Sequence, residues 1–255
     1  MALRIEQFMC RTDNFGILAH EPTSGRTFLV DAPEERPIVE AIGRTGWTPD
    51  TLLITHHHPD HVEANLALKE RFGVEIVGPA AEAAKIPGID RRVADGDRFA
   101  FGDEEVRVIA TPGHTSGHVC YHFPKAKVLF AADTLFALGC GRLFEEKPPV
   151  MHASLTKLVG LPVDTVVYCG HEYTQSNARF ALTIDPTNPA LKERAAEIDR
   201  LRATGEPTLP TTIGAELSTN PFLRWHDPAI RENLGMQNAS DVDVFSEIRK
   251  RKDAF

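Results

Sequence analysis

The first two thirds of the chain alternate short apolar runs with clusters of Gly, Pro, Asp and Asn, which is typical of β-strands joined by turns. The 3.6-residue apolar period predicts helices over residues 36–45 and 62–72. We therefore expect an α/β fold up to about residue 170. Its predicted strands are residues 5–10, 15–19, 27–30, 51–55, 74–77, 106–110, 128–132 and 165–168.

Polar side chains follow several of these strands at the point where each strand ends. The strand 51–55 runs into a histidine-rich segment, and later strands run into His114, Asp133 and His171. In α/β folds, ligands bind in loops at one end of the sheet, where successive strand ends are neighbours. These side chains are therefore expected to gather in one place.

The β pattern stops near residue 173, and the remainder of the chain has the pattern of helices. Asn188 and Pro189 are a favourable N-cap and first residue for a helix that stops at Gly205. A last helix is expected to begin after Ser240, which resembles the first residue of a capping box. We expect no strand in this region and two domains, residues 1–172 and 173–255.

Composition and charge narrow the classes of function. The 36 acidic and 28 basic residues give a net charge of -8, which argues against a broadly basic nucleic-acid-binding surface. The longest mainly apolar stretch, residues 128–140, is shorter than the ~20 residues that cross a bilayer. The first ten residues lack the apolar core of a signal peptide, so a cytoplasmic location is expected. The four cysteines form no CxxC pair and are expected to be reduced and mostly buried: Cys10, Cys120, Cys140 and Cys169.

The densest chemical feature is the histidine-rich segment THHHPDH. Successive side chains of an extended backbone alternate between two faces, so His56, His58 and Asp60 share one face and His57 points the other way. A helix that begins near Asp60 changes this phase and turns His61 toward a second point. One short segment can therefore supply ligands to two metals. Imidazole and carboxylate suit zinc, iron and manganese alike.

Three further side chains would complete a two-metal site: His114, Asp133 and His171. Taken alone, His171 is also typical of an ordinary hydrogen-bonded histidine, and Asp133 of a turn cap. The histidine-rich segment fits an exposed polar loop less well, because clustering three histidines and an aspartate without a metal is unfavourable. Together, these residues predict a metal centre.

At this point the sequence resembles the metallo-β-lactamase superfamily and, within it, glyoxalase II, the hydroxyacylglutathione hydrolases. The resemblance covers nearly the whole chain. The segments TPGHTSGH and GCGRLFE are shared by much of the superfamily, whereas CGHEYT, NPFLR and RKRKDAF are far more specific to glyoxalase II. The resemblance implies a metallo-β-lactamase-type αββα sandwich, residues 1–172, with a C-terminal helical glutathione-substrate-binding domain, residues 173–255.

The resemblance also implies a set of metal ligands. The family pattern places one metal on His56, His58 and His114 and the other on Asp60, His61 and His171, with Asp133 as the bridge. Two divalent ions are expected, with zinc as the first choice and iron or manganese as alternatives. His57 and His118 match motif positions without being ligands, so we expect them to support the ligands or to pack. The remaining histidines match nothing functional: His20, His122, His152 and His226.

Two divalent ions that share a water molecule lower its pKa from ~15.7 toward ~7 and so supply hydroxide at neutral pH. Asp60 and Asp133 are then the catalytic carboxylates that act with this bridging hydroxide. The motifs contain no serine or cysteine nucleophile with an adjacent base, and a thiolate leaves readily, so a thioester suits the site. The reaction implied is hydrolysis of S-2-hydroxyacylglutathione, such as S-D-lactoylglutathione, to glutathione and D-lactate, the second step of methylglyoxal detoxification.

The resemblance further implies that the glutathione moiety is held by Arg142, Tyr173, Arg249 and Lys252. Phe144 departs from the pattern, because some members have Tyr there and its hydroxyl contact is lost. Without the resemblance, Arg249 and Lys252 are typical of charges that complement a helix dipole. We expect a monomer that binds a small molecule, with no nucleic-acid or membrane partner.

Three other functions stay open at this stage. A persulfide dioxygenase on the same scaffold uses one iron and fewer of these ligands, and usually lacks the helical tail. A nucleic-acid phosphodiesterase would need a basic face or an added RNA-binding domain. A non-catalytic scaffold that kept its metals is disfavoured because every ligand position is filled.

Overall fold

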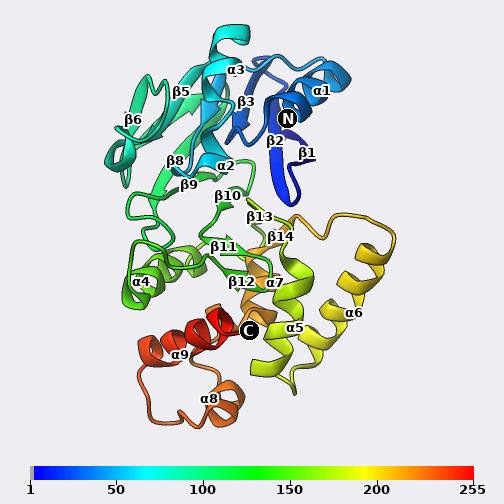
Figure 1. Ribbon diagram of the computed structural model, residues 1–255, viewed down its shortest axis with the longest axis vertical. Coiled ribbons are helices and arrows are strands. Elements are labelled where there is room, and N and C mark those ends of the chain that lie inside the picture. The colour runs from blue at the N-terminus through cyan, green and yellow to red at the C-terminus, as the bar shows by residue number, and fades with distance from the viewer. Residues whose placement is uncertain (1–2) are drawn as a thin grey trace. The chain divides into compact units, whose positions relative to one another are not determined.

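The computed structural model describes residues 3–255 of the chain, which form two compact units (Figure 1). Unit 1 comprises Met1–Thr111 and Thr115–Ala131, and unit 2 comprises Pro112–His114 and Ala132–Phe255. Within residues 3–255, no helix has both the length and the apolar character needed to cross a bilayer.

Unit 1 is built around β-strands, most of them where the apolar runs predict them. The strands are β1 (Arg4–Cys10), β2 (Asn14–Glu21), β3 (Arg26–Val30), β4 (Thr51–Leu53), β5 (Glu75–Pro79), β6 (Arg91–Val93), β7 (Arg98–Phe101), β8 (Glu104–Ala110), β9 (Val119–Phe123) and β10 (Val128–Ala132). One sheet has the order β1-β2-β3-β4-β5-β6, antiparallel from β1 to β3 and parallel from β3 to β6. The strands β10-β9-β8-β7 pair antiparallel in a second sheet.

The core of unit 1 has two parts. Helices α1 (Glu35–Thr45) and α3 (Asn65–Phe72) cover the first sheet with Ile38, Ile42 and Leu68, which belong to the same buried cluster as Leu29 of β3. Aromatic rings fill the space between the sheets, since Phe28 of β3 stacks on Phe123 of β9 with centroids 5.0 Å apart. Burial of these side chains from water is the main force that holds the layers together.

The predicted helix over residues 62–72 is divided into two, because α2 (Pro59–Val62) precedes α3. The carbonyl of Asp60 accepts a hydrogen bond from the Asn14 side chain at 3.1 Å, and the N–H of Ala64 donates to the carbonyl of Ala32 at 3.0 Å. These tertiary bonds replace the i→i−4 bond that a continuous helix would have between residues 64 and 60. The break therefore depends on partners distant in sequence, which periodicity cannot reveal.

Unit 2 is mainly helical. Its elements are β11 (Leu135–Phe136), β12 (Gly139–Cys140), α4 (Pro148–Val159), β13 (Val166–Cys169), α5 (Thr174–Ile184), α6 (Pro189–Ala203), β14 (Thr211–Thr212), α7 (Ile213–Thr219), the 3-10 helix η2 (Pro221–Leu223), α8 (Pro228–Leu234) and α9 (Asp241–Asp253). Leu138, Ala181 and Ile198 belong to a buried cluster that joins the β11–β12 turn to α5 and α6. Figure 1 shows α5 and α6 side by side, as their packing requires.

The predicted helix starts are confirmed by their hydrogen bonds. The Asn188 side chain accepts from the Leu191 N–H at 3.2 Å, and Ser240 Oγ accepts from the Asp243 N–H at 3.2 Å. The expectation of no strand after residue 173 is wrong for β14, in which Thr211 pairs with Val167 of β13. A strand of two residues is too short to show an alternating pattern.

Candidate active site

The histidine-rich segment of unit 1 follows β4 and leads into α2. His56 Nε2 lies 3.2 Å from His58 Nδ1, and the ring centroids of His56 and His61 are 4.1 Å apart. His57 lies against Glu82: its backbone N–H donates to Glu82 Oε2 at 2.8 Å, and its Nδ1 lies 2.9 Å from the same oxygen. Its ring also lies 5.1 Å from that of His58, edge to face. Glu82 is a partner that the sequence did not reveal.

Asp31, which follows β3, is the main functional candidate that the sequence reasoning missed. Its carboxylate accepts hydrogen bonds from the Thr55 N–H and hydroxyl, both at 2.8 Å, and its Oδ2 lies 2.8 Å from His61 Nδ1. Because an ionised carboxylate only accepts, His61 Nδ1 carries the proton and Nε2 presents its lone pair. The ligand atoms of Asp31, His56 and His61 all lie within 4.8 Å of one another. The signal that could have found Asp31 is its position directly after an apolar strand, as with Asp133.

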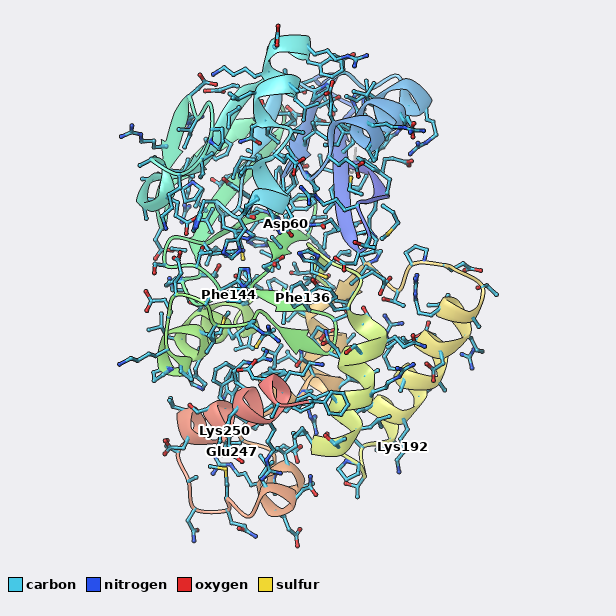
Figure 2. The ribbon with its side chains drawn as sticks, in the orientation of Figure 1. Asp60, Phe136, Phe144, Lys192, Glu247 and Lys250 are labelled. Atoms are coloured by element: carbon cyan, nitrogen blue, oxygen red, sulfur yellow. The ribbon has the colours of Figure 1, made fainter. Side chains whose placement is uncertain are left out.

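Asp60 lies on α2 (Figure 2). The Asn14 side chain donates to its Oδ2 at 3.1 Å, and that oxygen is 3.7 Å from His61 Nε2. Asn14 is buried at the start of β2, so it fixes the carboxylate from a rigid element. Asn14 thus holds the Asp60 carboxylate beside His61 Nε2 within unit 1.

His118 packs against a predicted ligand, as expected for a supporting residue. Its ring stacks on His56 with centroids 4.8 Å apart and an interplanar angle of 28°. Its Nδ1 lies 3.1 Å from the hydroxyl of Thr111, which fixes the ring. Both histidines are fully buried.

Unit 2 contains a second His/Asp cluster. His114 Nε2 and His171 Nε2 each lie 3.3 Å from the same Asp133 oxygen, Oδ2. The N–H of Gly170 donates to the carbonyl of Ala132 at 3.1 Å, which holds the residues before His171 and Asp133 side by side. All three side chains of this cluster are buried.

The hydrogen bonding of His114 tests whether this cluster suits a metal ion. His114 Nδ1 lies 2.8 Å from the backbone carbonyl of Arg142, which can only accept, so Nδ1 carries the proton. In the neutral ring the Nε2 lone pair then faces the Asp133 carboxylate, an unfavourable approach of two acceptors that a bound cation relieves. Two imidazoles and one carboxylate are also a ligand set that divalent metals accept. The residues therefore fit a divalent metal ion.

Gly141 allows the backbone to approach this cluster closely. A Cβ at this position would lie 2.0 Å from the Asp133 carbonyl oxygen and 3.2 Å from His114 Cβ. No side chain fits in that space. The loop that carries Arg142 is therefore packed directly on two of the predicted ligands.

The predicted glutathione-binding cations of unit 2 surround one carboxylate, that of Asp253. Arg249 donates to Asp253 Oδ1 through Nε at 3.1 Å and Nη2 at 2.8 Å, and Arg142 Nε lies 3.8 Å from the same oxygen. Lys252 precedes Asp253, and burial, followed by the charges of Arg249 and Arg142, lowers the pKa of Lys252 to about 8. Three cations thus lie close together near the end of α9.

Aromatic rings lie beside the two histidines of unit 2. Tyr173 stacks on His171 with centroids 4.7 Å apart and planes within 2°, and Phe136 of β11 lies 5.4 Å from the Tyr173 ring. Phe144 lies 5.2 Å from the ring of His114 and is 61% exposed (Figure 2). Tyr173 and Phe144 therefore offer partly exposed apolar surface next to the cluster.

The chain matches two family models that together cover most of its length. Residues 17–171 match the metallo-beta-lactamase superfamily, and residues 172–255 match the hydroxyacylglutathione hydrolase C-terminus. The chain is 71% identical to a hydroxyacylglutathione hydrolase of Chelativorans sp. (strain BNC1) and 70% identical to one of Mesorhizobium japonicum, in both cases over 100% of each chain.

Solved structures confirm the predicted fold. ETHE1 from Myxococcus xanthus superposes with a TM-score of 0.70 at 23% identity, covering 97% of this chain and 90% of that one. The protein TTHA1623, solved in a di-iron-bound form, superposes with a TM-score of 0.64 at 25% identity, covering 86% of this chain and 100% of that one. The metallo-β-lactamase fold, the two His/Asp clusters and the full-length similarity agree with one another, and the chain belongs to the hydroxyacylglutathione hydrolase (glyoxalase II) family of the metallo-β-lactamase superfamily.

Proposed function

We propose that this chain hydrolyses the thioester of S-2-hydroxyacylglutathione, with S-D-lactoylglutathione as the representative substrate, and releases glutathione and a 2-hydroxy acid. The observation that carries the proposal is that two clusters of functional side chains occur together in unit 2. One compact unit holds both a His/Asp cluster around Asp133 and a cation cluster around Asp253. The first suits the reacting thioester, and the second suits an anionic peptide such as glutathione.

We propose that two divalent ions bind the chain, with zinc as the first choice and iron or manganese as alternatives. Such ions, when bound, acidify a water molecule and polarise a carbonyl group. Asp31 and the Arg142 carbonyl support this role. Each holds the proton of one histidine, His61 or His114, on Nδ1 and so leaves the lone pair of Nε2 for a metal ion. The proposed ligands are His56, His58, Asp60, His61, His114, Asp133 and His171.

The proposed substrate-binding residues act at a distance from the reacting bond. Arg142, Arg249 and Lys252 supply positive charge for the carboxylates of glutathione, and the ring of Tyr173 supplies an apolar surface beside His171. A thiolate leaves without a proton donor at neutral pH more readily than an alkoxide does. The chain therefore needs to orient the thioester rather than to supply an acid.

Turnover and metal content, measured on the same sample, test this proposal. Purified protein is mixed with S-D-lactoylglutathione, loss of the thioester is followed by absorbance, and bound metal is measured by elemental analysis. We expect turnover in the metallated protein. His58→Ala and Asp133→Ala should each lose both bound metal and turnover, whereas His226→Ala, at an exposed position outside every motif, should lose neither.

Two outcomes would contradict the proposal. The absence of turnover in fully metallated protein would favour the dioxygenase that the sequence left open. Full activity of Asp133→Ala would contradict the proposed two-metal site.

We further propose that the protein acts as a cytoplasmic monomer without a nucleic-acid partner. The buried thiols are compatible with a reducing compartment.

A further inference from the structure

The short hairpin β11–β12 of unit 2 begins and ends beside the His/Asp cluster. Asp133 lies two residues before β11, and Gly141 directly follows β12. The Gly141 N–H donates to the Thr134 carbonyl at 3.2 Å, which closes the hairpin at its base. The ring centroid of Phe136 in β11 lies 6.0 Å from that of His171 (Figure 2). A shift of the hairpin would therefore move Asp133 and the apolar surface beside the cluster.

The turn of this hairpin contains a strained residue. Leu138 has a φ of +57°, in the left-handed region that residues other than glycine rarely adopt. Its side chain is buried in one cluster with Ala181 and Ile198, so glycine at this position would lose that packing. Backbone strain of this kind persists only where surrounding contacts enforce it, and it concentrates at functional sites.

Glu216 of α7 supplies the contact that enforces the turn. The Leu138 N–H donates to Glu216 Oε2 at 2.8 Å, and the Asn220 side chain donates to the same oxygen at 2.9 Å. The Thr211 hydroxyl donates to Glu216 Oε1 at 2.7 Å. The carboxyl group is buried, and its burial raises the pKa of Glu216. Because burial of a carboxyl group is unfavourable, the stability of α7 alone does not explain Glu at this position.

Asn220, which follows the last residue of α7, holds both strands of the hairpin. Its side-chain amide group donates to the carbonyl of Phe136 in β11 at 3.2 Å and to that of Gly139 in β12 at 3.0 Å. Asn220 is fully buried. Glu216 and Asn220 therefore fix the turn and the two strands of the hairpin from one end of a helix.

We infer that Glu216 and Asn220 are positioning residues, which hold the β11–β12 hairpin and with it Asp133 in the geometry that turnover requires. This inference rests on the proposed function. Both residues act through the backbone of the hairpin rather than on the reacting atoms. Their removal should therefore lower kcat more than it changes KM, because the interactions lost are those that matter in the transition state.

Two substitutions of Glu216 test this role. In Glu216→Gln the amide oxygen can still accept from Leu138 and Asn220, and the amide nitrogen can donate to the Thr211 hydroxyl, so kcat for S-D-lactoylglutathione should stay close to that of the unsubstituted protein. Glu216→Ala leaves the Leu138 N–H without this acceptor. We expect kcat of the fully metallated protein to fall roughly 10- to 100-fold in that variant, with little change in KM.

Hydrogen–deuterium exchange reports on the hairpin without any turnover. Backbone amides exchange faster when the contacts that hold a segment are lost. We expect the peptide that covers residues 135–142 to exchange faster in Glu216→Ala and at the original rate in Glu216→Gln. Unchanged exchange or full kcat in Glu216→Ala would overturn the inference.

Thr212→Ala is the matched control. The Thr212 hydroxyl caps the start of α7 by accepting from the Ala215 N–H at 3.1 Å, so its loss weakens the same helix through a bond that does not involve the hairpin. We expect the midpoint of thermal unfolding to fall by roughly 2–4 °C, with kcat and the exchange of residues 135–142 unchanged. Equal losses of kcat in Thr212→Ala and Glu216→Ala would mean that helix stability accounts for both, and would overturn the inference.

Glu216→Asp gives the decision if Glu216→Ala does not fold. It keeps the charge but retracts the carboxylate by one methylene group from the Leu138 N–H, so we expect a lower kcat and faster exchange of residues 135–142. Retention of both original values would overturn the inference. If the fully metallated, unsubstituted protein does not turn over the thioester, the proposed reaction fails, while the exchange measurements still decide whether Glu216 holds the hairpin.

Discussion

Asp31 shows how one buried side chain can set the chemistry of another. It accepts from the backbone and hydroxyl of Thr55 and lies against His61 Nδ1, in a backbone conformation with φ of +56°. Asn adopts that conformation readily, so Asp31→Asn removes the charge without straining the chain. We expect metal affinity to fall roughly 10- to 100-fold. Competition with a chelator of known affinity measures this, and unchanged affinity would exclude a role for Asp31 in orienting His61.

The backbone at Gly141 packs too closely on Asp133 to admit a side chain. Gly141→Ala would place a methyl group 2.0 Å from the Asp133 carbonyl oxygen, so we expect destabilisation by ~1–3 kcal/mol and lower metal content. Urea unfolding and elemental analysis measure the two effects. Gly43→Ala, within α1 and with nothing within 4 Å of the new Cβ, should stabilise the fold by ~0.4–1 kcal/mol. Equal effects of the two substitutions would refute the packing argument.

Lys252 gives a pH dependence with a defined sign. Its pKa of about 8 lies below the usual 10.5, so the side chain is charged below pH 8 and neutral above it. A cation that binds a carboxylate is lost as the pH rises, so we expect KM for the glutathione thioester to increase above about pH 8 without a matching fall in kcat. In Lys252→Met this pH step should disappear. A step of the same size in that variant would assign it to another group.

Residue types revealed much of the candidate site, but not the residues that orient it. His56 and His61 could be singled out because one short segment holds several histidines, and Asp133 because it directly follows an apolar strand and completes their ligand set. Glu82 could not, because its only distinction is that the folded chain brings it to the backbone and ring of His57. Roles of this kind depend on distances that the sequence does not contain.

The stability of α9 depends on the residue that caps its start, Ser240. Ser240→Ala removes the N-cap bond to the Asp243 N–H and should cost ~1 kcal/mol of unfolding free energy. Ser246→Ala, in the middle of the same helix, loses only a bond to the Val242 carbonyl and should be neutral or slightly stabilising. Urea unfolding compares the two, and a larger loss for Ser246→Ala would contradict the capping argument.

Elements were predictable where local signals decide them. The strand over residues 128–132 and the helix that starts after Asn188 were predicted closely, because an apolar run and an N-cap are local features. The break between α2 and α3 and the two-residue strand β14 depend on hydrogen bonds to distant segments. Such bonds can outweigh the helix or strand preference of the local sequence, and they do not change the periodic pattern of apolar residues.

The proposed metal ligands come from both compact units. A ligand that binds only the folded chain stabilises it by RT ln(1 + [L]/Kd). We therefore expect metal-depleted protein to unfold at a lower temperature and zinc to restore the transition. Calorimetry on depleted and reconstituted samples measures this. In His58→Ala the zinc-dependent shift should be smaller, and a full shift there would argue for binding elsewhere.

The division of the chain into domains 1–172 and 173–255 stays a prediction. The change from a β pattern to a helical pattern near residue 173 suggested this boundary. The contacts within the folded chain instead place Ala132–Phe255 together in one compact unit. The two boundaries differ because the pattern of apolar residues reflects the type of each local element, whereas a compact unit reflects which segments pack together. The type of an element can be predicted from the sequence, but the packing of distant segments becomes visible only in the folded chain.

The buried cysteines bear on how the protein withstands the disulfide of the glutathione that it is proposed to release. All are buried thiols, and burial raises the pKa of Cys10 to about 12 and that of Cys140 to about 11. Only the thiolate attacks a disulfide, and a group with a pKa near 11 is ionised to roughly one part in a thousand at pH 8. Oxidised glutathione, the disulfide of the proposed product, should therefore exchange very slowly with Cys10 and with Cys140, even though Cys140 lies beside Arg249.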